Sequence, residues 1–314
     1  METRFIIKLI NIWGYSMCFD RNKIIKEIIK ESKNHDNVVE LSKDNYIEYF
    51  EKFCSERLFR GIKEDFHLYP TILRSCEIKK SDNQSFKWYE ENIYKEYDRL
   101  SIQYLPYYGY LEDWLANGQH WGLPTRLLDW TYDPYVALYF AINNSKEYDN
   151  VYILETKPEY ELKELINFRE KVDEKTSQNR VLNNLFKNLE YLDCALGNET
   201  VLSSCDEESV IIQRAKNDNL PLFIKTHYAN PRLIAQSGMF EICVFPRASK
   251  NVDELKEYHI DVLKNSINKI YVIHKDKFDE MKELLNKKHI NRVKLFPDLQ
   301  NICKYISETV AQKK

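Results

Sequence analysis

Glycine is scarce in this chain, and the shortage limits which ligand-binding folds it can form. The sequence has 314 residues and 7 glycines, about a third of the number that is average for this length. No segment reads GxGxxG, GxxxxGKS or GxxxxGKT, so neither a glycine-cradled dinucleotide site nor a P-loop has support. We expect the remaining glycines to serve backbone needs, either tight turns or close approaches.

The composition indicates a packed protein of nearly balanced charge. Aromatic residues are abundant, with 22 Tyr, 15 Phe and 5 Trp, and the formal net charge is −3. This balance gives no general attraction to nucleic acid or to an anionic membrane. The apolar stretch at residues 5–15 is broken by Lys8 and Asn11 and is too short to span a bilayer, so we predict no membrane association.

Cysteine and histidine spacing gives no sign of a metal site. The 7 cysteines show no CxxC spacing, which fits reduced thiols in a cytoplasmic protein better than disulfides or zinc ligands. No two of the 7 histidines are four residues apart, and no HExxH is present. The sequence therefore predicts no metal ligands.

Apolar periodicity predicts an α+β protein with a mixed sheet and flanking helices. Strands are predicted over residues 57–62, 151–154, 220–225, 239–245, 269–274 and 293–296. One helix should run from residue 111 to 117 and end at Gly118, and others should begin at Asp133-Pro134 and Asn230-Pro231. We expect an N-terminal helical extension over 1–44 and a main domain over 45–310, with a helical insertion at about 157–219.

Three segments carry residues that suit binding or catalysis. In the first, Arg60 lies in a predicted strand beside Gly61, and Arg74 follows downstream. An arginine next to a glycine that admits close approach suits bidentate binding of phosphate or carboxylate. The alternative is an arginine that pairs with a carboxylate of the protein itself.

The second segment, residues 119–131, is the densest in chemically useful side chains. It reads QHWGLPTRLLDWT and contains one His, one Arg, one Asp, two Thr and two Trp. Arg126 and Asp129 could form an ion pair, or Asp129 could orient His120 for acid–base work. Alternatively, Gln119, Thr125, Thr131 and the charged residues form a structural network that holds a loop.

The third segment, residues 227–241, combines a predicted helix start with Arg232, Gln236 and a strand that carries Glu241. Backbone N–H groups at the helix start beside Arg232 could form an anion site. Glu241 points away from Phe240 and Ile242 on its strand. The alternative is a helix cap at Asn230 and a solvated Glu241.

Together these segments resemble the FRG domain family. The chain has Phe59-Arg60-Gly61, the block QHWGLPTRLLDWTYDPYVALYFA at Gln119–Ala141, Asn230-Pro231-Arg232 and a closing LFPDL at Leu295–Leu299. The resemblance spans roughly residues 45–310 and departs from the family pattern at Ile62 and Trp121. Family members look like bacterial and phage-associated proteins, some in defence or toxin contexts.

The resemblance leaves three functions open. The first is an enzyme with an ADP-ribosyltransferase-like core that uses NAD as a co-substrate, an analogy at the level of the fold. Its catalytic residues would be His120, Asp129 and Glu241, and its ligand-binding residues would be Arg60, Gly61, Arg74, Gln119, Thr125, Arg126, Thr131, Arg232 and Gln236. The second is a non-catalytic module for a nucleotide, a nucleic acid or a protein, which binds through Arg60, Arg126 and Arg232. In the third, the segments form a folding core and the function lies in the insertion.

Overall fold

The computed structural model describes residues 22–31, 37–51, 56–75, 85–101, 103–104, 111–163, 207–227, 231–244, 249 and 251–311. Residues 1–21 of the predicted N-terminal extension and residues 164–206 of the predicted insertion lie outside these ranges. So does Asn230, at which one helix was expected to begin.

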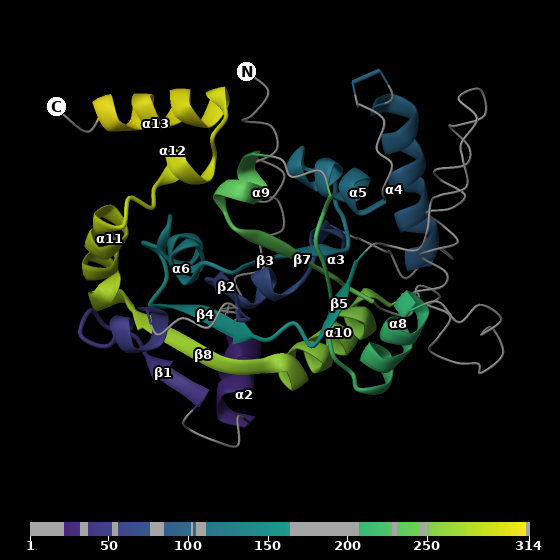
Figure 1. The fold of residues 1–314 in the computed structure, drawn as a ribbon, viewed down its shortest axis with the longest axis horizontal. Coiled ribbons are helices and arrows are strands. Elements are labelled where there is room, and N and C mark those ends of the chain that lie inside the picture. The colour runs from purple at the N-terminus through teal and green to yellow at the C-terminus, as the bar shows by residue number, and fades with distance from the viewer. Residues whose placement is uncertain are drawn as a thin grey trace, which may run out of the picture.

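Within the described residues, eight strands form one sheet in the order β1-β8-β4-β2-β3-β7-β6-β5. They are β1 (Val38–Glu40), β2 (Leu58–Ile62), β3 (Leu127–Thr131), β4 (Asn150–Thr156), β5 (Tyr160–Leu162), β6 (Leu222–Ile224), β7 (Gly238–Ile242) and β8 (Ile267–His274). The β1–β8 and β5–β6 pairs are parallel, and the other five are antiparallel. The sheet curls into a half-barrel (Figure 1). The predicted α+β class with a mixed sheet is confirmed.

Helices cover both faces of this sheet (Figure 1). They are α2 (Lys23–Glu31), α3 (Thr71–Ser75), α4 (Phe86–Ser101), α5 (Leu111–His120), α6 (Pro134–Ile142), α8 (Glu207–Asn217), α9 (Pro231–Ala235), α10 (Val252–Ser266), α11 (Phe278–Lys287), α12 (Arg292–Leu295) and α13 (Leu299–Ala311). A π-helical turn covers Ile47–Glu51, and 3-10 turns cover Asp65–Leu68 and Lys275–Lys277. In the described part of the chain, no helix combines the length and apolar character needed to cross a membrane.

Strand β4 shows how the sheet divides the core. Its side chains alternate between the two faces, as the pleat requires. Val151 and Ile153 join an apolar cluster with α6 and α11, whereas Tyr152 and Leu154 join a cluster that includes residues of α2, α5 and α10. A strand covered on both faces is expected to read as a nearly continuous apolar run, as this strand does.

Helix α6 lies directly on strand β2. The side chain of Asp133 caps the helix by accepting from the N–H of Tyr135 at 2.8 Å, and Pro134 occupies the first turn, as predicted. A Cβ on Gly61 would lie 1.9 Å from the carbonyl oxygen of Ala137 and 2.8 Å from the amide nitrogen of Ala141. The absence of a side chain at Gly61 therefore lets the helix backbone touch the strand.

The predicted end of α5 at Gly118 is wrong. Gly118 lies inside the helix, which continues to His120. The chain leaves the helix at Gly122, whose φ is +95°, a conformation that glycine adopts without strain. The N–H of Leu123 donates to the carbonyl of Gly118 (2.9 Å), and that of Gly122 donates to Gln119 (3.0 Å). This pair of hydrogen bonds is the Schellman motif that ends many helices.

The strand predicted over residues 293–296 is also wrong. These residues belong mostly to α12, a single helical turn. The side chain of Asn291 accepts a hydrogen bond from the N–H of Lys294 at 3.0 Å and so caps the turn. Periodicity alone does not separate a short apolar run in a strand from one in a helix.

A buried ion pair joins the start of β3 to helix α4. Arg126 and Glu90 are both 0% exposed, and the guanidinium donates to both carboxylate oxygens, at 2.9 and 2.7 Å. A third N–H donates to the carbonyl of Cys243, beyond the end of β7, at 3.2 Å. The predicted pairing of Arg126 with Asp129 is therefore wrong, because residues three apart on a strand point to opposite faces.

Gly61→Ala should destabilise the fold by about 1–3 kcal/mol, because the new methyl group meets helix backbone that cannot rotate away. Gly238→Ala is the matched control, since its Cβ would meet the flexible tip of Leu233 at 2.5 Å. Urea unfolding measures both variants. Equal losses of stability would contradict the proposed contact between α6 and β2.

Glu90→Gln should lower the free energy of unfolding by about 3–5 kcal/mol, because it leaves the buried guanidinium of Arg126 without its counter-charge. Glu96→Gln on the same helix is the control, since Glu96 pairs with Arg99 at the surface and exposed pairs contribute little. Denaturant unfolding followed by circular dichroism compares the two. If Glu96→Gln lowered the free energy of unfolding as much as Glu90→Gln, burial would not explain the effect of the Arg126–Glu90 pair.

Candidate functional site

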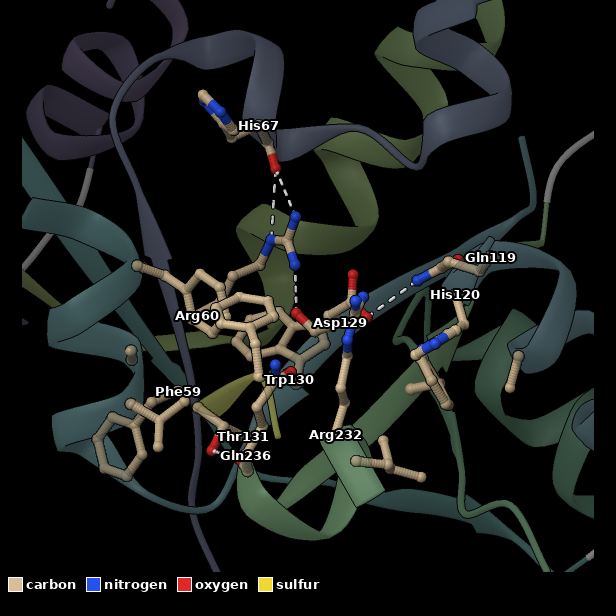
Figure 2. Close-up of a pocket in the computed structure, with 18 of the residues that line it drawn as sticks. Phe59, Arg60, His67, Gln119, His120, Asp129, Trp130, Thr131, Arg232 and Gln236 are labelled. Atoms are coloured by element: carbon tan, nitrogen blue, oxygen red, sulfur yellow. Dashed lines mark hydrogen bonds between the residues drawn. The ribbon is translucent and has the colours of Figure 1, made fainter. Parts of the chain in front are cut away.

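A cavity of about 390 Å³ opens between strands β2 and β3 and helices α5, α6 and α9. All three segments singled out in the sequence contribute to its wall (Figure 2). The lining residues are Phe59, Arg60, Gly61, Lys63, His67, Arg74, Ala116, Gln119, His120, Asp129, Trp130, Thr131, Val136, Ala137, Phe140, Arg232, Leu233, Gln236, Phe240 and Phe296. The volume is within the range of small-molecule pockets.

Arg60 bridges the strand that carries it, the turn after that strand, and β3. Its Nε and Nη2 donate to the carbonyl of His67 at 3.3 and 2.9 Å, and its Nη1 donates to the carbonyl of Asp129 (Figure 2). Burial lowers the pKa of Arg60 to about 10. Among the described residues, no carboxylate lies within ion-pair distance of this guanidinium. Carbonyl dipoles stabilise the charge of the guanidinium, which has further N–H groups that can donate to another partner.

Positive charge gathers at this end of the cavity. Arg60, Lys63 and Arg74 all line it, and burial lowers the pKa values of Lys63 and Arg74. Burial, followed by the charges of Arg60 and Arg74, lowers the pKa of His67 to about 4. The imidazole is therefore neutral near pH 7, and the three longer side chains make this end of the cavity cationic.

Asp129 is the only carboxylate among the described residues that line the cavity. It is exposed between buried neighbours on β3. One carboxylate oxygen accepts from Nε2 of Gln119 at 2.9 Å, and the hydroxyl of buried Thr125 donates to Oε1 of the same amide. Thr125 thus orients the amide of Gln119, and this amide orients the carboxylate of Asp129. Thr125 itself does not line the cavity.

His120 does not contact Asp129 through a hydrogen bond in the described part of the structure. Its ring packs edge-on against Trp121, with centroids 5.0 Å apart. Burial, followed by the charge of Arg232, lowers the pKa of His120. His120 is therefore a neutral wall residue, oriented by packing rather than by a carboxylate.

Arg232 closes the opposite side of the cavity and is neutralised there. Its guanidinium donates from Nε and Nη2 to one oxygen of Asp298, at 2.9 and 2.7 Å, and lies 5.4 Å from the ring centre of Phe296. Although burial opposes the shift, hydrogen bonds from Asn301 and Arg232 lower the pKa of Asp298 to about 2. This pair ties helix α9 to the segment between α12 and α13.

Gln236 and Thr131 share this side of the cavity. Nε2 of Gln236 donates to the carbonyl of Leu295 at 3.0 Å, and the hydroxyl of Thr131 donates to the carbonyl of Gln236 at 2.6 Å. Both side chains line the cavity and also hold its wall together.

Nine of the twelve residues singled out in the sequence line the cavity: Arg60, Gly61, Arg74, Gln119, His120, Asp129, Thr131, Arg232 and Gln236. Thr125, Arg126 and Glu241 do not. Glu241 is neither solvated nor in the cavity, because it is 1% exposed and its Oε2 accepts from Nε1 of Trp130 at 3.0 Å. Burial raises its pKa to about 7.

Lys63 and His67 line the cavity, but the sequence did not single them out. They follow β2, at the turn where the carbonyl of His67 accepts hydrogen bonds from Arg60. Lysine is common on solvated turns, so its type carries no signal. The nearness of His67 to the tripeptide Phe59-Arg60-Gly61 in the sequence was the one available indication.

The family comparison covers the centre of the sheet and most of the cavity wall. Residues 55–150 match the model of the FRG domain. Comparisons with curated proteins and with solved structures found no match. The matched range contributes β2, β3 and α6, while Arg232, Leu233, Gln236, Phe240 and Phe296 complete the cavity from outside it. The protein is thus an FRG domain-containing protein, with the domain at residues 55–150.

Proposed function

We propose that the cavity binds a small phosphorylated ligand of the nucleotide class. The observation that carries this proposal is the unequal charge of the described part of the wall, which contains Arg60, Lys63 and Arg74 but a single carboxylate, Asp129. Arginine forks suit phosphate oxygens, and lysine adds a point charge. Because Arg60 is already held by carbonyls, it is pre-organised and loses little side-chain entropy on binding.

The rest of the wall suits the base of a nucleotide. Five aromatic residues line the cavity, and two of them, Phe140 and Phe296, keep part of their surface exposed, whereas Phe59, Trp130 and Phe240 are buried. Aromatic rings stack on bases with little dependence on sequence. The cavity of about 390 Å³ is near the lower end for small-molecule pockets, which favours a mononucleotide or one half of a dinucleotide such as NAD.

Catalysis on NAD is the second candidate function, and its specific support is Asp129. Transfer of an ADP-ribosyl group develops positive charge on the ribose, which a fixed carboxylate stabilises. Asp129 faces the cavity and is oriented by Gln119, whereas Glu241 lies in the core. An ADP-ribosyltransferase-like reaction here would therefore use Asp129. The family resemblance is the support for a protein or nucleic-acid acceptor and for a role in bacterial defence, both of which remain part of this proposal.

Isothermal titration calorimetry with inorganic phosphate, AMP, ADP, ADP-ribose and NAD tests the binding proposal. We expect at least one nucleotide to bind more tightly than phosphate, with an affinity that falls as salt rises. Lys63→Ala and Arg74→Ala should each weaken it roughly tenfold or more, since a charged hydrogen bond is worth about 1.5–3 kcal/mol. Lys282→Ala on α11, which pairs with Asp279 at the surface, is the control. Failure of the whole panel to bind would refute the proposal.

Incubation with labelled NAD and cell extract tests the catalytic candidate. Asp129→Asn should abolish transfer and hydrolysis of NAD while NAD binding persists, because the carboxylate acts on the transition state rather than on the phosphates. Asp149→Asn, at an exposed carboxylate, should keep full turnover. A wild-type protein that binds NAD but neither transfers nor hydrolyses it would eliminate the enzyme and leave the binding function.

A further inference from the structure

Three potential metal ligands meet in the core, on the other side of Trp130 from the cavity. Glu241 lies on β7 and Cys243 follows two residues later, so both side chains point to the same face. His259 reaches them from α10. Each of the three is 1% exposed. One ligand atom from each lies within 4.8 Å of the other two.

The ring of His259 is oriented by a hydrogen bond on its distal nitrogen, as in many metal-binding histidines. Its Nε2 lies 3.0 Å from the carbonyl oxygen of Leu68. Because a carbonyl only accepts, Nε2 must carry the hydrogen, and Nδ1 of the neutral ring presents a lone pair to the cluster. A backbone carbonyl on the distal nitrogen is a common way of fixing the tautomer and orientation of a ligating histidine.

The carboxylate of Glu241 is held in the same manner. Its Oε2 accepts from Nε1 of Trp130 at 3.0 Å, which leaves Oε1 facing the cluster. Oε1 lies 3.7 Å from Nδ1 of His259 and 3.8 Å from Sγ of Cys243. The first distance is too long for a hydrogen bond, and the second is a weak S–H contact. The outer atoms of both side chains are thus fixed, while the inner atoms surround a common point.

We propose that Glu241, Cys243 and His259 bind a divalent transition-metal ion of the zinc type. Bonds of about 2.0–2.3 Å to thiolate, imidazole and carboxylate place tetrahedral ligand atoms about 3.3–3.8 Å apart. The two separations above match this spacing. A set of one sulfur, one nitrogen and one oxygen donor suits borderline-soft ions rather than calcium or magnesium.

Charge and space are also consistent with a bound ion. Binding displaces the thiol proton of Cys243 to solvent, so thiolate and carboxylate together balance a divalent cation in the interior. A cavity of about 20 Å³ borders Glu241 and His259, enough room for one ligand of the size of water. Glu241 and Cys243 are two residues apart and His259 lies on the next described element, α10, a spacing that matches no common zinc motif.

Metal analysis of the purified full chain tests the site. After chelation and dialysis, we expect the wild type to take up one equivalent of Zn²⁺ from ZnCl₂, measured by competition with a chromophoric chelator. Cys243→Ser should weaken binding by more than about 100-fold, beyond the loss typical of an outer partner. Cys303→Ser is the matched control, because Cys303 is exposed on α13. Equal zinc binding by both variants, or none by the wild type, would overturn the proposal.

A second measurement avoids substitutions in the core. X-ray absorption at the zinc edge of the wild-type protein should show one sulfur neighbour at about 2.3 Å and nitrogen or oxygen neighbours at about 2.0–2.1 Å. This result would support the site even where Cys243→Ser fails to fold. Zinc without a sulfur neighbour, or with several, would assign the ion to other residues and overturn the proposal.

Discussion

Strands β2 and β3 pair at a single position, Phe59 with Thr131. The cavity lies where the two strands diverge, and it depends on the contacts that hold them at this separation. Beyond this pair, the carbonyl of Asp129 accepts from the side chain of Arg60. The same guanidinium reaches the turn after β2 through the carbonyl of His67. One side chain thus satisfies carbonyls on two segments and bridges the gap between the strands. A lysine could not do this, because it lacks the planar fork of donors.

Strand alternation then decides which charged groups belong to the cavity. Asp129 and Thr131 share the face toward α6, whereas Arg126 lies on the opposite face. On β7, Phe240 opposes Asp129 and lines the cavity, while Glu241 faces the core. Two charged residues of the same family block therefore serve different purposes. Arg126 fixes β3 to α4 through Glu90, and Asp129 presents a carboxylate to solvent.

Some features set by local backbone chemistry could be predicted from the sequence, although the end of α5 was misplaced at Gly118 instead of Gly122. Features set by packing could not be predicted. The start of α6 follows from Asp133-Pro134, and the close approach at Gly61 follows from the residue itself. Residue type did not separate Arg60 from Arg126, because both are arginines beside apolar strand residues. Their roles depend on partners distant in sequence, His67 and Glu90. The family block located the cavity wall without indicating which of its charged residues face inward.

The cavity and the buried Glu–Cys–His cluster share supports, which links them mechanically. Trp130 lines the cavity and also donates to Glu241. In the 3-10 turn, the carbonyl of His67 receives Arg60, and the next carbonyl, that of Leu68, contacts His259. A shift of this turn would move a cavity cation and a cluster ligand together. Since close-packed interiors transmit such displacements, we expect a change at the cluster to reach the cavity through these shared supports.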